Sequence, residues 1–195
     1  MRITLRTLLL AGVVTATTVL NGQPPNPRTS SHEVDLALTY DALRNNAVGG
    51  GDFWQQGGGL ELSAEFYHGL GMTASVGGSH ASNIRDSGVN LTMVTDLFGP
   101  RYAWTIPSGK ITLFGQGLIG EAHGVDGAFL SSAGALSSYN AFALQTGGGV
   151  DWRLSRRFAA RLIQADWLRT QFPNAGTNVQ NNLRIGTGIV FRLQR

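Results

Sequence analysis

The sequence predicts an all-β protein, an eight-stranded antiparallel up-and-down β-barrel that crosses a membrane. Three observations lead to this prediction. Segments in which polar and apolar residues alternate recur eight times, the links between them alternate between short and long, and the chain begins like an exported protein. Alternation with period two indicates a strand, because successive side chains of a strand point to opposite faces.

The N-terminal residues predict export. Arg2 and Arg6 precede the apolar stretch Leu8–Leu20, which is shorter than the roughly 17–25 residues that a membrane-spanning helix needs. A positive start followed by a short apolar stretch is typical of a secretory signal peptide. We therefore expect a cleaved signal peptide over residues 1–22 and a flexible, Pro- and Ser-rich lead-in over residues 23–31. An uncleaved amphipathic start is the alternative.

Composition narrows the function classes. The chain contains no cysteine, which excludes a thiol nucleophile, a lipid-anchoring cysteine and cysteine-ligated zinc. Its formal net charge of +3 includes the two arginines of the expected signal peptide, and Lys110 is its single lysine. Without a basic run we expect no nucleic-acid partner. No apolar stretch after residue 22 is long enough for a spanning helix, so a mature protein that crosses a membrane does so as a barrel.

The first half of the chain contains four expected strands, over residues 32–41, 59–67, 72–80 and 89–97. In each of them we expect the apolar residues to share the outer face. For the fourth strand this outer set is Val89, Leu91, Met93 and Leu97, opposed by Asn90, Thr92 and Asp96. The pattern then changes phase, so that Tyr102 and Trp104 become the apolar set, and we expect a β-bulge at Gly99-Pro100.

The second half contains four more expected strands, over residues 110–123, 140–153, 158–170 and 181–195. The faces of the first are ambiguous and the third alternates poorly. The last strand alternates cleanly, with Leu183, Ile185, Ile189, Phe191 and Leu193 on one face and Asn182, Arg184, Gly186, Gly188 and Arg192 on the other. Val190 is the exception, because it is apolar on the polar face.

The links between these strands alternate in length. Short links lie at residues 68–71, 106–109 and 154–157, and longer links lie at 42–58, 81–88, 124–139 and 171–180. Short turns on one side and longer loops on the other are typical of outer-membrane barrels, and with eight strands both chain termini are expected on the periplasmic side.

Two environments suit strands of this kind. In a soluble sandwich the apolar face is the core and the charged face meets water. In a membrane barrel the apolar face meets lipid and the charged face lines the lumen. Eight strands of membrane-crossing length, the export signal and the alternating links favour the barrel. An arginine facing lipid at the bilayer centre costs roughly 2–4 kcal/mol, which explains why the apolar faces carry so little charge.

The charged faces predict a lumen network. Its expected members are Glu33, Asp35, Glu61, Glu65, Asp96, Asp151, Arg153, Arg161, Arg184 and Arg192. An eight-stranded barrel is just wide enough for side chains to fill it, so paired charges would form a plug. A narrow pore held open by the same charges is the alternative.

Two motifs suggest a cofactor or a metal, and neither is supported by its context. Residues 115–120 spell G-x-G-x-x-G, which would need a following helix to bind a dinucleotide, whereas the next residues are rich in glycine. The histidines His32, His68, His80 and His123 are scattered and share no metal-ligand spacing. We therefore expect no cofactor and no metal site.

Several segments resemble the outer-membrane β-barrel family that includes opacity-type porins and OmpA-like transmembrane domains. They are "FGPRYAW" (98–104), "FGQGLIGEAHG" (114–124), residues 142–174 and "QNNLRIGTGIVFR" (180–192), and the resemblance covers roughly residues 32–195. It implies an eight-stranded outer-membrane barrel in contact with lipid. The closing strand also resembles the insertion signal that the barrel-assembly machinery reads, with Arg184, Gly186, Ile189 and Phe191 at matching positions, although the chain ends on Gln194-Arg195 instead of an aromatic residue.

Residues 80–83, "HASN", resemble the motif of outer-membrane lipid A deacylases. The resemblance implies His80 as the base, Ser82 as the nucleophile and Asp86 or Asp96 as the orienting carboxylate. The motif lies late in those enzymes but at the end of the third strand here. We expect a monomeric outer-membrane barrel with a structural or surface-interaction role and no catalysis. A narrow passive pore and a deacylase-like enzyme are the alternatives.

Overall fold

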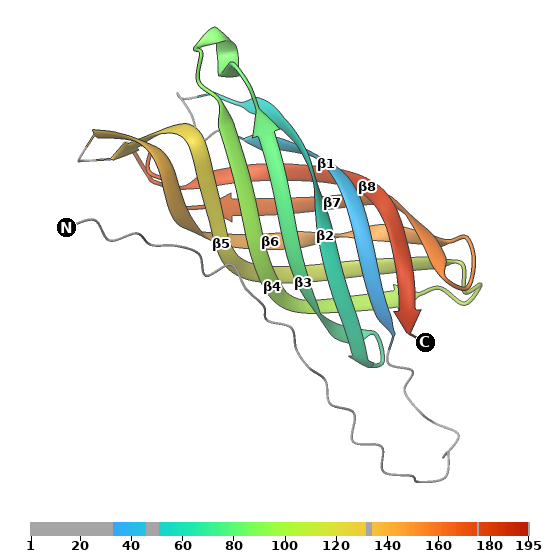
Figure 1. The fold of residues 1–195 in the computed structure, drawn as a ribbon. Coiled ribbons are helices and arrows are strands. Elements are labelled where there is room, and N and C mark those ends of the chain that lie inside the picture. The colour runs from blue at the N-terminus through green and yellow to red at the C-terminus, as the bar shows by residue number, and fades with distance from the viewer. Residues whose placement is uncertain (1–32, 46–50, 132–133, 175, 195) are drawn as a thin grey trace, which may run out of the picture.

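The computed structural model describes residues 33–45, 51–131, 134–174 and 176–194, which form one closed barrel of antiparallel strands in chain order (Figure 1). β1 pairs with β8, which closes the sheet. The predicted fold class is therefore confirmed. The expected signal peptide and lead-in, residues 1–22 and 23–31, lie outside the described residues. Within the described part of the chain, no helix has the length and apolar character needed to cross a membrane.

The first six strands are longer than the sequence pattern indicated, whereas β7 and β8 have the predicted length. The strands are β1 Val34–Asn45, β2 Phe53–Tyr67, β3 Leu70–Ala81, β4 Leu91–Thr105, β5 Ile111–Ser131, β6 Gly134–Arg153, β7 Phe158–Thr170 and β8 Gln180–Gln194. The expected long links at 42–58 and 124–139 were therefore wrong, because most of their residues belong to strands. Their Gly-, Ala- and Ser-rich composition suggested loops, but a β-ladder is made by backbone groups and does not need large side chains.

The two ends of the barrel differ. The short links from β2 to β3, β4 to β5 and β6 to β7 lie at the end where β1 begins and β8 ends, which we call the turn end (Figure 1). The opposite end, which we call the loop end, carries the 3₁₀ turn η1 (Ile84–Asp86), the β5–β6 hairpin and the β7–β8 connection.

Burial alternates along the strands and shows which face is which. On β1, Asp41 and Thr39 are buried inside the barrel, whereas Leu38 and Tyr40 are more than half exposed on the outside. The same holds around the wall, where the exposed large apolar side chains include Leu60, Leu62, Val76, Phe98, Tyr102, Ile119, Phe142, Trp152, Ile163, Ile185 and Ile189. A soluble sandwich would bury its apolar face, so this apolar outer wall is that of a transmembrane barrel.

The loop-end half of β4 reverses the expected faces. Leu91, Met93 and Leu97 are buried inside the barrel, whereas Thr92 and Asp96 face outward. The predicted outer set of this strand was therefore wrong. So was the bulge at Gly99-Pro100, because β4 pairs with β3 without a register shift from Leu91 to Tyr102. The change of phase in the sequence arises because the barrel interior itself becomes apolar near the loop end.

A bulge does occur in β7. The register shifts against β8 between Arg161 and Gln164, and Leu162 and Ile163 both face outward. This irregularity explains why the 158–170 segment alternates poorly. Because two successive residues face lipid, Arg161 and Gln164 both point into the lumen although they are three positions apart.

An apolar layer fills the lumen at the loop end. Its buried members are Leu43, Phe53, Ile84, Leu91, Met93, Leu97, Leu118, Ala122, Phe129, Ala141, Ala143, Leu168 and Phe172. Phe172, from the β7–β8 connection, stacks on Phe129 with ring centroids 4.9 Å apart. The buried side-chain amide of Gln180 accepts a hydrogen bond from the Phe172 N–H (2.8 Å) and donates one to its carbonyl (2.9 Å), which holds that ring over the barrel mouth.

The apolar exception of the last strand has a similar explanation. Val190 lies inside the barrel and is flanked by Ala37 of β1 and Ala159 of β7. These three buried side chains form a small apolar cluster of their own. Val190 therefore fills interior space between two alanines.

Candidate functional site

The centre of the lumen is occupied by charged side chains from four different strands, which we call the ionic layer. Its members are Glu61 of β2, Arg101 of β4, Asp151 of β6 and Arg161 of β7, and each is nearly or fully buried. Two arginines and two carboxylates balance each other in charge. Because all four side chains point to the barrel axis, strands that are distant in sequence contribute to one cluster.

Arg161 makes the shortest contacts of this layer. Its Nη1 donates to Glu61 Oε2 at 2.5 Å, and its Nε and Nη2 donate to the two carboxylate oxygens of Asp151 at 2.9 and 3.3 Å. The second contact is bidentate, which uses the planar fork of the guanidinium. Arg161 is 1% exposed, so both carboxylates are neutralised by a group that water does not reach.

Arg101 reaches the same two carboxylates from the other side. Its Nη2 lies 3.5 Å from Asp151 Oδ2 and its Nη1 lies 3.9 Å from Glu61 Oε2. Both guanidinium groups also lie over the ring of Phe114, with centroid distances of 3.8 Å for Arg101 and 4.4 Å for Arg161. The negative face of a buried ring stabilises a nearby cation.

Glutamine side chains complete the hydrogen bonding. Gln116 Nε2 and Gln164 Nε2 donate to Glu61 Oε1 at 3.1 and 2.8 Å, and Gln164 Oε1 accepts from Arg161 at 2.7 Å. Gln164 Nε2 also donates to Asp166 Oδ2 at 2.8 Å. A buried carboxylate that is both ion-paired and hydrogen-bonded loses less from its desolvation. The ionic layer is therefore a plug built from partnered groups.

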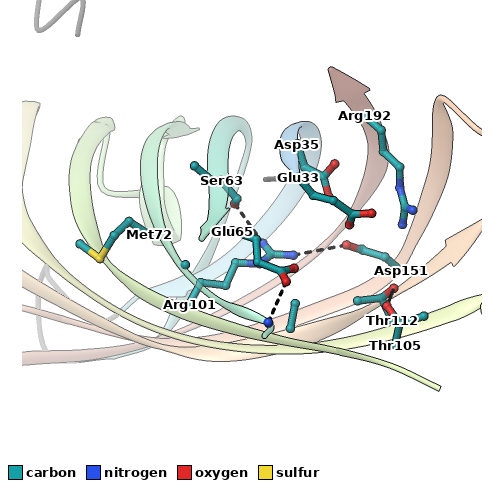
Figure 2. A pocket seen from close by; sticks show the side chains of 14 residues that line it. Glu33, Asp35, Ser63, Glu65, Met72, Arg101, Thr105, Thr112, Asp151 and Arg192 are labelled. Atoms are coloured by element: carbon teal, nitrogen blue, oxygen red, sulfur yellow. Dashed lines mark hydrogen bonds and ion pairs between the residues drawn. The ribbon is translucent and has the colours of Figure 1, made fainter. Parts of the chain in front are cut away.

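The other predicted lumen residues are distributed along the barrel. Arg184 lies nearer the loop end and donates to Thr95 Oγ1 at 3.2 Å, in a small cavity that Asp41 also lines. Glu33, Asp35, Glu65 and Arg192 line a cavity of about 40 Å³ at the turn end, next to Arg101 and Asp151 (Figure 2). Arg153 lies at the end of β6, beside the turn at Gly109.

One predicted lumen residue lies elsewhere. Asp96 is exposed on the outer wall, opposite Glu121 of β5, so its assignment to the lumen network was wrong. The assignment failed because the apolar residues of this half of β4 were expected on the outer face, whereas they face inward and the polar residues between them face outward.

Sequence reasoning missed Arg101, Phe114, Gln116 and Gln164. Arg101 followed the supposed phase change at Gly99-Pro100, and Gln116 lies within the G-x-G-x-x-G motif, which the structure places in the middle of β5. Gln164 was hidden by the bulge. If the side chains of β4 are taken to alternate strictly and Tyr102 and Trp104 face outward, Arg101 faces the inside of the barrel.

The assembly-signal residues of β8 and the HASN segment (80–83) also have definite positions in the barrel. Among the assembly-signal residues, Arg184 and Gly186 face the lumen, and Ile189 and Phe191 face outward, where Phe191 meets Phe158 edge-on. His80 faces outward and its Nδ1 lies 2.9 Å from the Thr92 hydroxyl. Asn83 bonds the backbone of Gly88 and the carboxylate of Asp86, which organises the β3–β4 connection.

The closed eight-stranded wall, the apolar exterior and the filled lumen define a transmembrane β-barrel fold of the small outer-membrane type. Among solved structures, the chain is similar to Ail, the attachment invasion locus protein of Yersinia pestis, at 20% identity over 83% of this chain and 99% of that chain, with a TM-score of 0.54. A structure of Ail with the heparin analogue sucrose octasulfate gives 0.53 at the same identity and coverage. Neisserial surface protein A gives 0.58 at 8% identity, over 82% and 97% of the two chains.

These likenesses concern the fold. No protein-family description matches the sequence, and no curated protein matches it. The eight-stranded architecture that the sequence pattern and the resemblance predicted is confirmed by the barrel and by these neighbours.

We predict that Arg161→Met destabilises the folded barrel by about 3–5 kcal/mol, because Glu61 and Asp151 would keep their burial and lose their closest cation. Arg192→Met, at the turn-end cavity, is the matched control and should cost much less. Urea unfolding of the refolded protein, followed by tryptophan fluorescence, measures both. Equal losses in the two variants would show that the ionic layer does not determine stability.

Proposed function

We propose that the chain is an integral protein of a bacterial outer membrane, with a closed lumen and a structural or surface-interaction role exerted from its loop end. The observation that carries the proposal is the filling of the lumen by two successive layers. The ionic layer blocks its centre and the apolar layer blocks its loop end. A barrel without a passage acts through its surfaces.

The outer wall supports a membrane location. Aromatic side chains are exposed near both ends of the wall, Tyr102, Trp104 and Trp152 toward the turn end and Trp54, Phe142 and Trp167 toward the loop end. Two aromatic girdles that flank an apolar band are characteristic of outer-membrane barrels. We further propose that the chain is a monomer, that lipid surrounds it, and that the barrel-assembly machinery inserts it through the closing strand.

The loop end supports a surface role. Residues 134–140 of the β5–β6 hairpin are all exposed, and the hairpin extends beyond the neighbouring strands (Figure 1). One similar fold is named an attachment invasion locus protein and was solved with a heparin analogue, and another is named a surface protein. We take attachment as the hypothesis for this chain.

The proposed closed lumen is tested by isolating the full chain from the outer membrane of an expressing bacterium. We expect a faster gel band without boiling than with boiling, which indicates a detergent-resistant barrel, and no discrete current steps in a planar bilayer. Reproducible single-channel steps would favour the narrow passive pore instead. A soluble periplasmic protein without the heat shift would overturn the membrane location.

Attachment is tested by measuring how many bacteria that carry the chain in their outer membrane adhere to a heparin-coated surface. Cells with the wild-type chain should attach more than cells with the empty vector. A variant in which a two-residue Asn-Gly turn replaces residues 130–135 should fall to the empty-vector level while it keeps its heat shift, because the turn removes the tip of the hairpin, joins the paired residues Phe129 and Leu136, and leaves the buried Phe129 ring in place. Attachment unchanged by this replacement would contradict a role of the hairpin.

We also propose that the chain is not an enzyme. The His80 ring contacts the Thr92 hydroxyl on β4. Asp96 lies four residues further along β4 than Thr92 and pairs with Val76 instead of His80. A deacylase triad requires a carboxylate at the histidine. Lipid A from cells that overexpress the chain should therefore keep all its acyl chains, and mass spectrometry measures this. A loss of acyl chains that Ser82→Ala abolishes would establish the deacylase alternative.

A further inference from the structure

The outer wall has a groove over β1–β4 that the fold does not account for. Tyr40, Gly58, Gly78 and Val94 pair across the four strands in one row and face outward. The two glycines leave a depression whose sides are formed by Leu38, Leu60, Val76 and Val94. It is a shallow, open depression of about 360 Å³ with a predominantly apolar lining. The groove lies on the outer face of the wall. The row Leu38, Leu60 and Val76 forms its side toward the turn end.

The two glycines differ in what they do for the fold. A Cβ at Gly58 would lie 2.6 Å from the Thr39 carbonyl oxygen, so the close approach of β1 requires glycine there. A Cβ at Gly78 would meet nothing within 4 Å, and the φ angle of Gly78 is not in the left-handed region. Neither packing nor backbone conformation therefore demands glycine at position 78. Glycine at position 78 leaves the depression open, and a larger side chain there would fill it.

The polarity of the groove changes along its length. The next outward row toward the loop end contains Gln56, His80 and Thr92, which pair across β2–β4. Tyr40 Oη donates to Gln56 Oε1 at 2.9 Å, and His80 Nδ1 lies 2.9 Å from Thr92 Oγ1. Hydrogen-bonding residues therefore lie on the loop-end side of the apolar groove. This arrangement matches an amphiphile whose chain points to the turn end and whose headgroup lies toward the loop end.

We propose that this groove binds one acyl chain of an outer-leaflet glycolipid, with its headgroup hydrogen-bonded by the row of Gln56, His80 and Thr92. The proposal rests on the membrane location proposed above, in which the loop end faces outward. Lipid is the occupant because the surrounding wall is apolar and continuous with the groove. Asp96 pairs with Val76 at the β4 edge of the row on the turn-end side, so the acyl chain would lie over Leu38 and Leu60, away from this carboxylate.

The test fills the groove without disturbing the fold. Gly78→Leu places a side chain where the structure has open space. Gly117→Leu is the matched control, because a Cβ at Gly117 of β5 also meets nothing within 4 Å but lies outside the groove. The purified full chain and both variants are titrated with lipid A in detergent, and native mass spectrometry counts the lipids that remain bound. All three proteins must first show the heat shift of a folded barrel.

We expect the wild type and Gly117→Leu to retain one lipid A molecule, and Gly78→Leu to bind it about tenfold more weakly, which corresponds to about 1.4 kcal/mol. Equal retention by Gly78→Leu would overturn the proposal, as would equal loss by Gly117→Leu, which indicates unspecific lipid contact. A dimer that Gly78→Leu disrupts would assign the groove to a second copy of the chain and also overturn it. A wild type without the heat shift would instead contradict the proposed function.

Discussion

The pairing of Arg161 with Glu61 and Asp151 is the interaction on which the rest of the structure depends. A lumen of eight strands is too narrow to keep charged groups hydrated, so each buried charge needs a partner supplied by the protein. Arg161 joins β7 to β2 and β6, and Arg101 joins β4 to the same carboxylates. The layer therefore links alternate parts of the wall through the barrel axis, and it blocks that axis as a direct consequence.

The outward and inward faces of the same strands differ in composition because they meet different surroundings. Lipid requires an apolar exterior over the part of the wall that it surrounds, whereas the interior has two compositions, ionic at the centre and apolar at the loop end. Where the interior is apolar, both faces of a strand are apolar or mixed, and alternation no longer says which face is inside. Leu91, Met93 and Leu97 on β4 are the clearest case, and Val190 beside Ala37 and Ala159 is a smaller one.

Because side chains fill the lumen, the outer surfaces of the barrel are where contacts with other molecules would form. The loop end offers the exposed β5–β6 hairpin, and the wall offers the groove over Gly58 and Gly78. His80 lies in the outward row beside this groove and contacts the Thr92 hydroxyl.

The sequence by itself determined the number of strands, their order and the outward face of most of them, because period-two alternation and short turns are local properties. It also determined that Glu61, Asp151 and Arg161 point inward, since each lies on a polar face or beside one. Only the tertiary structure decided which charges meet. The β7 bulge turns both Arg161 and Gln164 inward, Arg101 crosses the lumen to reach Asp151, and Asp96 faces outward. Register shifts and contacts across the barrel axis join residues from distant strands, and no local pattern records them.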